Sequence, residues 1–183
     1  GIRKVMIKRI VAIGPESTGK STLCQQLAKH YNTDWVKEYA REYLLKTGSA
    51  YTFENLLDIA KSQIESEDLA IRQLTARSTR PSLMFCDTDM YVMKVWCEFV
   101  FEKCHHWILN RIAERKYDLY LLCNVDIPWI KDELREYPDL KNRQKLYCFY
   151  KDVLTNQHVP WVEISGNYHE RLEKAIAEVN KIL

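Results

Sequence analysis

The stretch that decides the fold is Gly14-Pro15-Glu16-Ser17-Thr18-Gly19-Lys20-Ser21. It matches the pattern G-x-x-x-x-G-K-[ST], in which two glycines let a row of backbone N–H groups surround an anionic oxygen cluster. The β-branched run at residues 10–13 predicts a buried strand before it, and residues 21–31 predict a helix after it. This strand–loop–helix order is the context that binding of a nucleoside triphosphate requires.

The motif predicts a role for each of its polar residues. Lys20 is expected to bridge the β- and γ-phosphates of ATP, and the Ser21 hydroxyl is expected to bind Mg²⁺. The other predicted phosphate contacts are Gly14, Glu16, Ser17, Thr18, Gly19 and Thr22. ATP and Mg²⁺ are therefore the predicted cofactors, and the sequence does not separate ATP from GTP.

Short apolar runs alternate with longer amphipathic stretches along the rest of the chain. Strands are predicted at residues 10–13, 34–38, 83–86, 119–123 and 161–164, and helices at 21–31, 42–46, 53–77, 88–115 (one or two), 140–154 and 170–183. This alternation predicts an α/β protein, a P-loop NTPase three-layer sandwich with a mainly parallel five-stranded sheet and a helical lid at about 127–145. With 183 residues and no evident linker, residues 1–183 are expected to form a single P-loop kinase-like domain.

The composition of the chain argues against nucleic-acid and membrane partners. The chain is 46% apolar and 28% charged, and its net charge of +2 gives no support for binding nucleic acid. No apolar run approaches the roughly 20 residues that span a bilayer, so no membrane partner is expected. Six widely spaced cysteines without a signal peptide favour reduced thiols and a cytoplasmic location. Whether the chain forms a homo-oligomer is left open.

Carboxylates follow two predicted strands, at the sheet edge where parallel α/β proteins bind ligands. Asp87 follows residues 83–86 and is expected to hold Mg²⁺ directly or through water; the alternative is a helix N-cap. Glu38 is expected to accept a proton from an attacking hydroxyl or to hold a sugar; the alternative is a surface acid paired with Arg41. Which acid is the general base is not decided.

A charged stretch after the fourth predicted strand is expected to form the lid. Arg135 can close over the γ-phosphate and neutralise charge in the transition state, and a solvated helical face is the alternative. Arg143, on the polar helix that follows, is interpreted as part of such a solvated face. Residues 164–168 are interpreted as a joint between strand and helix, rather than as a contact to a nucleotide base.

These motifs together resemble the ribosylnicotinamide kinase domain of the NadR family. The resemblance extends over nearly the whole chain and rests on residues 14–22, 38–43, 85–89 and 126–135. It implies a kinase that passes the γ-phosphate of ATP to the 5′-hydroxyl of nicotinamide riboside, giving nicotinamide mononucleotide. It does not extend to the adenylyltransferase and DNA-binding parts of bifunctional members, so those activities are not implied.

The resemblance also implies site residues. The implied catalytic residues are Lys20, Glu38, Asp87 and Arg135, and the implied substrate contacts are Glu38, Tyr39, Arg41, Asp89 and Trp129. The chain departs from the family pattern at Lys37, where members carry an aromatic residue, and this departure bears on the identity of the acceptor.

Three classes of function are compared. The first is the riboside kinase, the second a kinase for another nucleoside or nucleotide, and the third a regulatory ATP-binding ATPase without an acceptor. Acids at strand ends together with a lid favour a kinase. Regulatory GTPases are disfavoured because no Asn-Lys-x-Asp follows a late strand, and AAA-type ATPases because 183 residues leave little room for further modules.

Overall fold

Five strands form one sheet in the computed structural model, which describes residues 6–77, 82–127 and 139–183. The strand order is β2-β3-β1-β4-β5, and all four pairings are parallel. The strands are β1 (Ile7–Ile13), β2 (Trp35–Val36), β3 (Ser82–Asp87), β4 (Leu119–Cys123) and β5 (Trp161–Ile164). The predicted parallel α/β fold is therefore confirmed.

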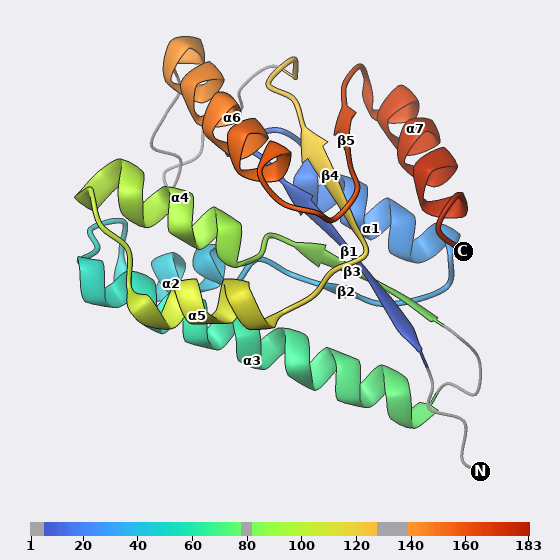
Figure 1. The fold of residues 1–183 in the computed structure, drawn as a ribbon, viewed down its shortest axis with the longest axis horizontal. Coiled ribbons are helices and arrows are strands. Elements are labelled where there is room, and N and C mark those ends of the chain that lie inside the picture. Colours follow the sequence, from blue (N-terminus) through green and yellow to red (C-terminus); the bar gives the residue numbers. More distant parts are fainter. Residues whose placement is uncertain (1–5, 78–81, 128–138) are drawn as a thin grey trace.

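Helices cover both faces of this sheet and make three layers (Figure 1). They are α1 (Lys20–His30), α2 (Tyr39–Thr47), α3 (Phe53–Arg77), α4 (Met90–Phe101), α5 (His106–Glu114), α6 (Leu140–Thr155) and α7 (Tyr168–Asn180). Helices α1 and α7 pack on one face, and α3, α4 and α6 pack on the other. Helices α2 and α5 join α3 and α4 in a further apolar cluster.

The central strand β1 shows why the sheet is covered on both faces. Successive side chains of a strand point to opposite faces, and here both sets are apolar. Ile10 and Ala12 pack against α1 and α7, whereas Val11 and Ile13 pack in the cluster on the opposite face. All four are at most 1% exposed, so β1 is buried between two helical layers.

Parallel pairing brings the carboxyl ends of all five strands to one edge of the sheet. After β1 the chain first builds β2 and β3 on one side of it and then β4 and β5 on the other. The loop after β1 therefore lies at the switch point of an open α/β sheet, where ligands bind.

One predicted element differs from the observed fold, one alternative is decided, and one prediction falls largely outside the described residues. The second strand comprises only Trp35–Val36, so Glu38 is not in a strand but precedes α2 as its N-cap. The region predicted as one or two helices forms two, because Glu102 takes the left-handed conformation (φ 58°) that ends α4. The predicted lid at 127–145 falls mostly on residues 128–138, which lie outside the described residues.

Two further observations concern the chain as a whole. All six cysteines are free, and four of them are buried, in agreement with the predicted reduced thiols. None of the helices in the described ranges has both the length and the apolar content that a membrane crossing needs.

Candidate active site

Two glycines with positive φ shape the loop after β1. Gly14 has a φ of 146°, and a Cβ placed on it would lie 2.6 Å from the backbone oxygen of Cys123. Gly19 directly precedes α1. Its φ of 79° places its backbone in the left-handed region, which glycine adopts most readily. The loop can therefore curl tightly against β4 and direct backbone N–H groups inward.

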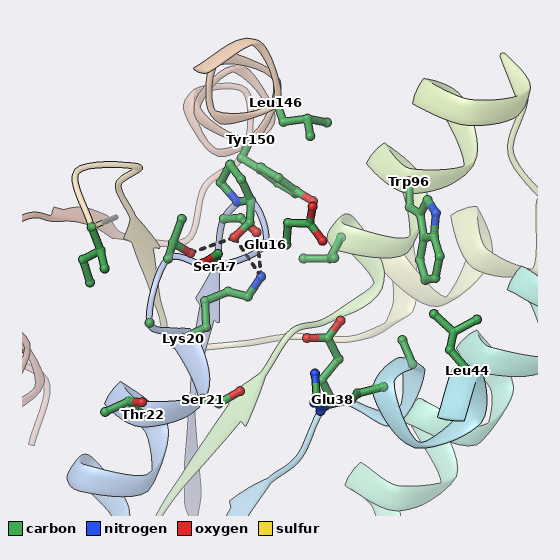
Figure 2. Close-up of a pocket in the computed structure, with 18 of the residues that line it drawn as sticks. Glu16, Ser17, Lys20, Ser21, Thr22, Glu38, Leu44, Trp96, Leu146 and Tyr150 are labelled. Atoms are coloured by element: carbon green, nitrogen blue, oxygen red, sulfur yellow. Dashed lines mark hydrogen bonds between the residues drawn. The ribbon is translucent and has the colours of Figure 1, made fainter. Parts of the chain in front are cut away.

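Lys20 is buried and lies over the loop from the first turn of α1. Its Nζ donates to the backbone oxygens of Gly14 (2.8 Å) and Pro15 (3.2 Å), and the Thr18 hydroxyl donates to the same Pro15 oxygen at 2.7 Å (Figure 2). The ammonium is thus held at the centre of the loop by neutral carbonyl groups, which leaves its charge available to an anion.

The loop is held from the far end of the chain by Arg171 of α7. This guanidinium is 2% exposed and donates to the backbone oxygens of Thr18 (2.7 Å), Gly166 (2.8 Å) and Asn124 (3.0 Å). It also forms an ion pair with Asp126. One side chain therefore joins the phosphate-binding loop to the segments after β4 and β5.

Sequence reasoning missed Arg171, although a signal was present. Arg171, Ala175 and Val179 are spaced by four residues and form the buried face of α7. A single arginine on an otherwise apolar face needs internal partners, because a buried charge is costly without them.

Asp87, at the end of β3, faces the first turn of α1. Its Oδ2 accepts a hydrogen bond from the Ser21 hydroxyl, whereas its Oδ1 is buried without a partner among the described residues. Burial, and then the charge of Glu38, raise the pKa of Asp87 from 3.8 to about 7, against the opposing effects of Lys20 and Ser21. An orphaned carboxylate oxygen beside a hydroxyl is a donor set that suits Mg²⁺, so the residues fit the predicted metal.

Asp89, and not Asp87, caps the helix that follows β3. The alternative prediction that Asp87 is the helix N-cap is therefore wrong. The N-cap of α4 is Asp89, which accepts from the backbone N–H of Tyr91 (3.0 Å) and from the Tyr120 hydroxyl (2.7 Å). Burial raises its pKa to about 7. Between the two acids, Thr88 takes a φ of 85°, which is rare for a β-branched residue and typical of strained functional sites.

A cavity of about 330 Å³ lies between the phosphate-binding loop and helices α2, α4 and α6. Figure 2 shows Lys20 on one side, Glu38 entering from below, and Tyr150 and Leu146 of α6 above. The apolar and aromatic part of the wall is Ala40, Leu44, Val92, Trp96, Phe99, Ile127, Leu146, Tyr150 and Tyr168. The cavity therefore combines a polar end, formed by the loop after β1 and Lys20, with an apolar end that carries the Glu38 carboxylate.

The predicted site residues are only partly brought together. The cavity wall includes all eight predicted loop residues together with Glu38 and Arg41. Among the described residues, Tyr39, Asp87 and Asp89 are outside this wall, and Asp87 reaches it only through Ser21. Trp129 and Arg135 lie outside the described residues.

Two interpretations of the C-terminal half are corrected. Tyr168 lines the cavity, so residues 164–168 are more than a joint between strand and helix. Arg143 is only 4% exposed, so its assignment to a solvated face is wrong. Its Nε and Nη1 are buried, and no acceptor for them exists among the described residues.

The conspicuous run Cys104-His105-His106 has an ordinary structural role. His105 stacks on Phe53 with ring centroids 3.7 Å apart, and its Nε2 lies 2.7 Å from the Phe53 backbone oxygen. Within the described ranges, no group of three or more His, Cys, Asp or Glu side chains is placed to hold a metal ion.

Known proteins resemble this chain over most of its length. A relative from Escherichia coli (strain K12), the trifunctional NAD biosynthesis/regulator protein NadR, is 23% identical over 187 residues, which cover 100% of this chain and 44% of that protein. The chain thus spans less than half the length of this relative. The resemblance to NadR expected from the motifs is confirmed.

Solved structures share the fold. A crystal structure of NadR protein in complex with NR has a TM-score of 0.79 at 23% identity, and one in complex with NAD and AMP-PNP has a TM-score of 0.72 at 23% identity. Each covers 96% of this chain and 49% of the NadR chain. A deoxyadenosine kinase from M. mycoides has a TM-score of 0.61 at 12% identity and covers 94% of this chain and 99% of its own.

A family model gives the membership. The model AAA_28, described as an AAA domain, matches residues 9–171. Because the match covers most of the chain, the chain belongs to the AAA_28 family.

Proposed function

We propose that this chain is an ATP-dependent small-molecule kinase that phosphorylates the 5′-hydroxyl of nicotinamide riboside to give nicotinamide mononucleotide. The observation that carries the proposal is the placement of Lys20 and Glu38 in the wall of one cavity. One is the cation expected at the β- and γ-phosphates, and the other is a carboxylate able to orient or deprotonate an alcohol. An ATPase can use such a carboxylate to activate water, but it does not need the apolar and aromatic wall that surrounds Glu38 here.

The chemistry of the cavity supports this acceptor. Nicotinamide riboside carries a fixed positive charge on an aromatic ring, and Glu38 together with the indole of Trp96 offers a carboxylate and a π-face. The relative named NadR and the NadR structures in complex with NR and with AMP-PNP support the same pair of substrates.

Each residue near the phosphates has a proposed role. Lys20 moves from its carbonyl partners to the phosphate oxygens, and backbone N–H groups of residues 16–19 surround these oxygens. Ser21 and Asp87 hold Mg²⁺, which when bound offsets the negative charge of the phosphates. Glu38 positions the acceptor hydroxyl and takes its proton; Asp87 is the alternative base.

Arg143 is proposed to add a further positive charge at the phosphates. The charged groups of the described wall balance, with Lys20 and Arg41 against Glu16 and Glu38, whereas a bound triphosphate brings a large negative charge. Arg143 lies one turn before Leu146 on the same face of α6. A buried guanidinium without a described partner is costly until an anion approaches it.

We expect Arg143→Met to raise the melting temperature of the ligand-free protein and to weaken AMP-PNP binding about tenfold or more, the value of a charge-assisted hydrogen bond. Thermal unfolding with and without AMP-PNP measures both effects. Lys141→Met removes an exposed cation from the same helix and serves as the control. Unchanged AMP-PNP affinity in Arg143→Met would remove the residue from the proposed site.

Other predictions are carried forward unchanged. The single kinase-like domain over residues 1–183, the lid with Trp129 and Arg135, the substrate contacts of Tyr39 and Asp89, and a cytoplasmic location remain predictions. The expectation that the chain binds neither nucleic acid nor a membrane also remains a prediction. A homo-oligomer remains possible.

An acceptor panel tests the proposed function. ADP release is measured with Mg²⁺–ATP and nicotinamide riboside, each of the common nucleosides and deoxynucleosides, or no acceptor. We expect release that depends on nicotinamide riboside and yields one equivalent of nicotinamide mononucleotide per ADP. Faster turnover of a deoxynucleoside would favour a deoxynucleoside kinase, the activity for which the M. mycoides neighbour is named. Equal ADP release without an acceptor would favour an ATPase.

A further inference from the structure

The side-chain amide of Gln63 forms hydrogen bonds with the backbone on both sides of Glu38. Gln63 lies on α3, and its Oε1 accepts the backbone N–H of Tyr39 at 2.7 Å. Its Nε2 donates to the backbone oxygen of Lys37 at 3.2 Å. Because an N–H group only donates and a carbonyl only accepts, these partners fix the orientation of the amide. One side chain therefore holds the residues on both sides of the cavity carboxylate.

This contact lies at the start of α2, where Glu38 does not cap the helix with its side chain. Glu38 is the N-cap of α2, a position whose side chain usually accepts a hydrogen bond from the first turn of the helix. Here the Glu38 side chain makes no such bond, and Gln63 satisfies another free donor of the first turn, the N–H of Tyr39. The Glu38 carboxylate is thus left to point into the cavity (Figure 2).

The segment needs such support because the strand before it is short and lies at the sheet edge. Strand β2 pairs with β3 only through Trp35 and Val36. Glu38 stands two residues beyond the last of these pairs, so the sheet itself does not fix its backbone. Gln63 supplies the missing hydrogen bonds from a helix that is 25 residues long.

The burial of Gln63 indicates that these bonds are maintained. Its side chain is 2% exposed and lies on the buried face of α3 beside Ile59, Ala60 and Ile64. A buried amide is destabilising unless its donor and acceptor are both satisfied, and Oε1 and Nε2 each have a backbone partner here.

We propose that Gln63 is a positioning residue that aims the Glu38 carboxylate at the acceptor hydroxyl. The inference rests on the proposed function, since it gives Glu38 a reacting partner. Gln63 contacts neither ATP nor the acceptor in this assignment, and it acts only through the backbone of residues 37–39. Its loss should therefore lower kcat without altering nucleotide binding.

Gln63→Met tests the assignment, because methionine has a similar volume and cannot replace either hydrogen bond. We expect kcat with the acceptor to fall about tenfold to a hundredfold, the usual cost of a displaced catalytic group, and AMP-PNP affinity to stay within about twofold. Gln73→Met, an exposed position on the same helix, is the matched control and should match the wild type.

A double-mutant cycle separates positioning from a merely structural effect. In a Glu38→Gln background the carboxylate is gone, so adding Gln63→Met should cause no further loss of kcat. An equal loss in both backgrounds would overturn the proposal, because Gln63 would then act independently of Glu38.

Amide hydrogen exchange supplies a measurement that needs no turnover. We expect the Tyr39 amide to exchange at least about tenfold faster in Gln63→Met than in the wild type and in Gln73→Met. Unchanged exchange at Tyr39 would overturn the proposal whatever the acceptor is. Failure of the wild type to turn over any acceptor would instead contradict the proposed kinase function. The exchange at Tyr39 would then still show whether Gln63 holds the backbone next to Glu38.

Discussion

Replacing Lys20 with alanine should reduce turnover about a thousandfold or more. Lys20 is the one cation that the loop itself contributes to the described cavity wall, and its Nζ is already held at the centre of the loop by the Gly14 and Pro15 oxygens. Removal of a preorganised charge that stabilises a transferring phosphoryl group costs this much in rate. Steady-state ADP release measures the loss.

The fold should survive this change. Alanine is a good helix former at the start of α1, and a buried charge is removed rather than added. Circular dichroism and thermal unfolding check that the variant is folded, and Lys29→Ala, at an exposed position in the last turn of α1, is the matched control. Normal catalysis by a folded Lys20→Ala protein would contradict the role assigned to the loop.

Asp87→Asn should lose most of the Mg²⁺-dependent activity and bind Mg²⁺ more weakly. The buried Oδ1 of Asp87 has no partner among the described residues, and the amide that replaces the carboxylate is a poorer ligand without charge. We expect kcat to fall about a hundredfold or more, with a higher Mg²⁺ concentration needed for half-maximal rate. Mg²⁺ titration of ADP release provides the measurement.

The same substitution should change how stability depends on pH. The pKa of Asp87 is raised from 3.8 to about 7, so between these values the folded state binds more protons than the unfolded state. The free energy of unfolding of the wild type therefore falls as pH rises through this window, by up to about 1.4 kcal/mol per pH unit for each such group. Asp87→Asn removes one such group, so its stability should fall less steeply.

Asp89→Asn is the contrasting control, because the pKa of Asp89 is also raised to about 7 but its carboxylate caps α4. This variant should show a similar change in the pH dependence of urea unfolding and keep its Mg²⁺ dependence. If Asp87→Asn kept normal Mg²⁺ dependence while Asp89→Asn lost it, the assigned roles of the two acids would be exchanged.

The loop and the sheet could be predicted because their signals are local. The spacing of Gly14, Gly19 and Lys20 and the apolar run before them specify a strand, a turn and a helix within a dozen residues. The Gly14 position also had to be glycine for a reason that the sequence hides, since the clash it avoids is with Cys123, far away in the chain.

The sequence could not show which of Asp87 and Asp89 caps the following helix. Both acids follow the same apolar run, and only the left-handed backbone at Thr88 directs one toward Ser21 and the other toward Tyr120. Gln63 was missed for a similar reason, because its partners are backbone atoms of residues 37 and 39. Backbone partners leave no mark on the sequence.

The contact between Arg171 and Thr18 has a consequence for how the protein matures on the ribosome. The loop that carries Thr18 is synthesised before α7, and the side chain that holds the Thr18 oxygen is encoded 153 residues later. At about 5–20 residues per second, the nascent loop waits roughly 8–30 s for this partner. A nascent chain should therefore gain its affinity for nucleotide only after α7 has left the exit tunnel.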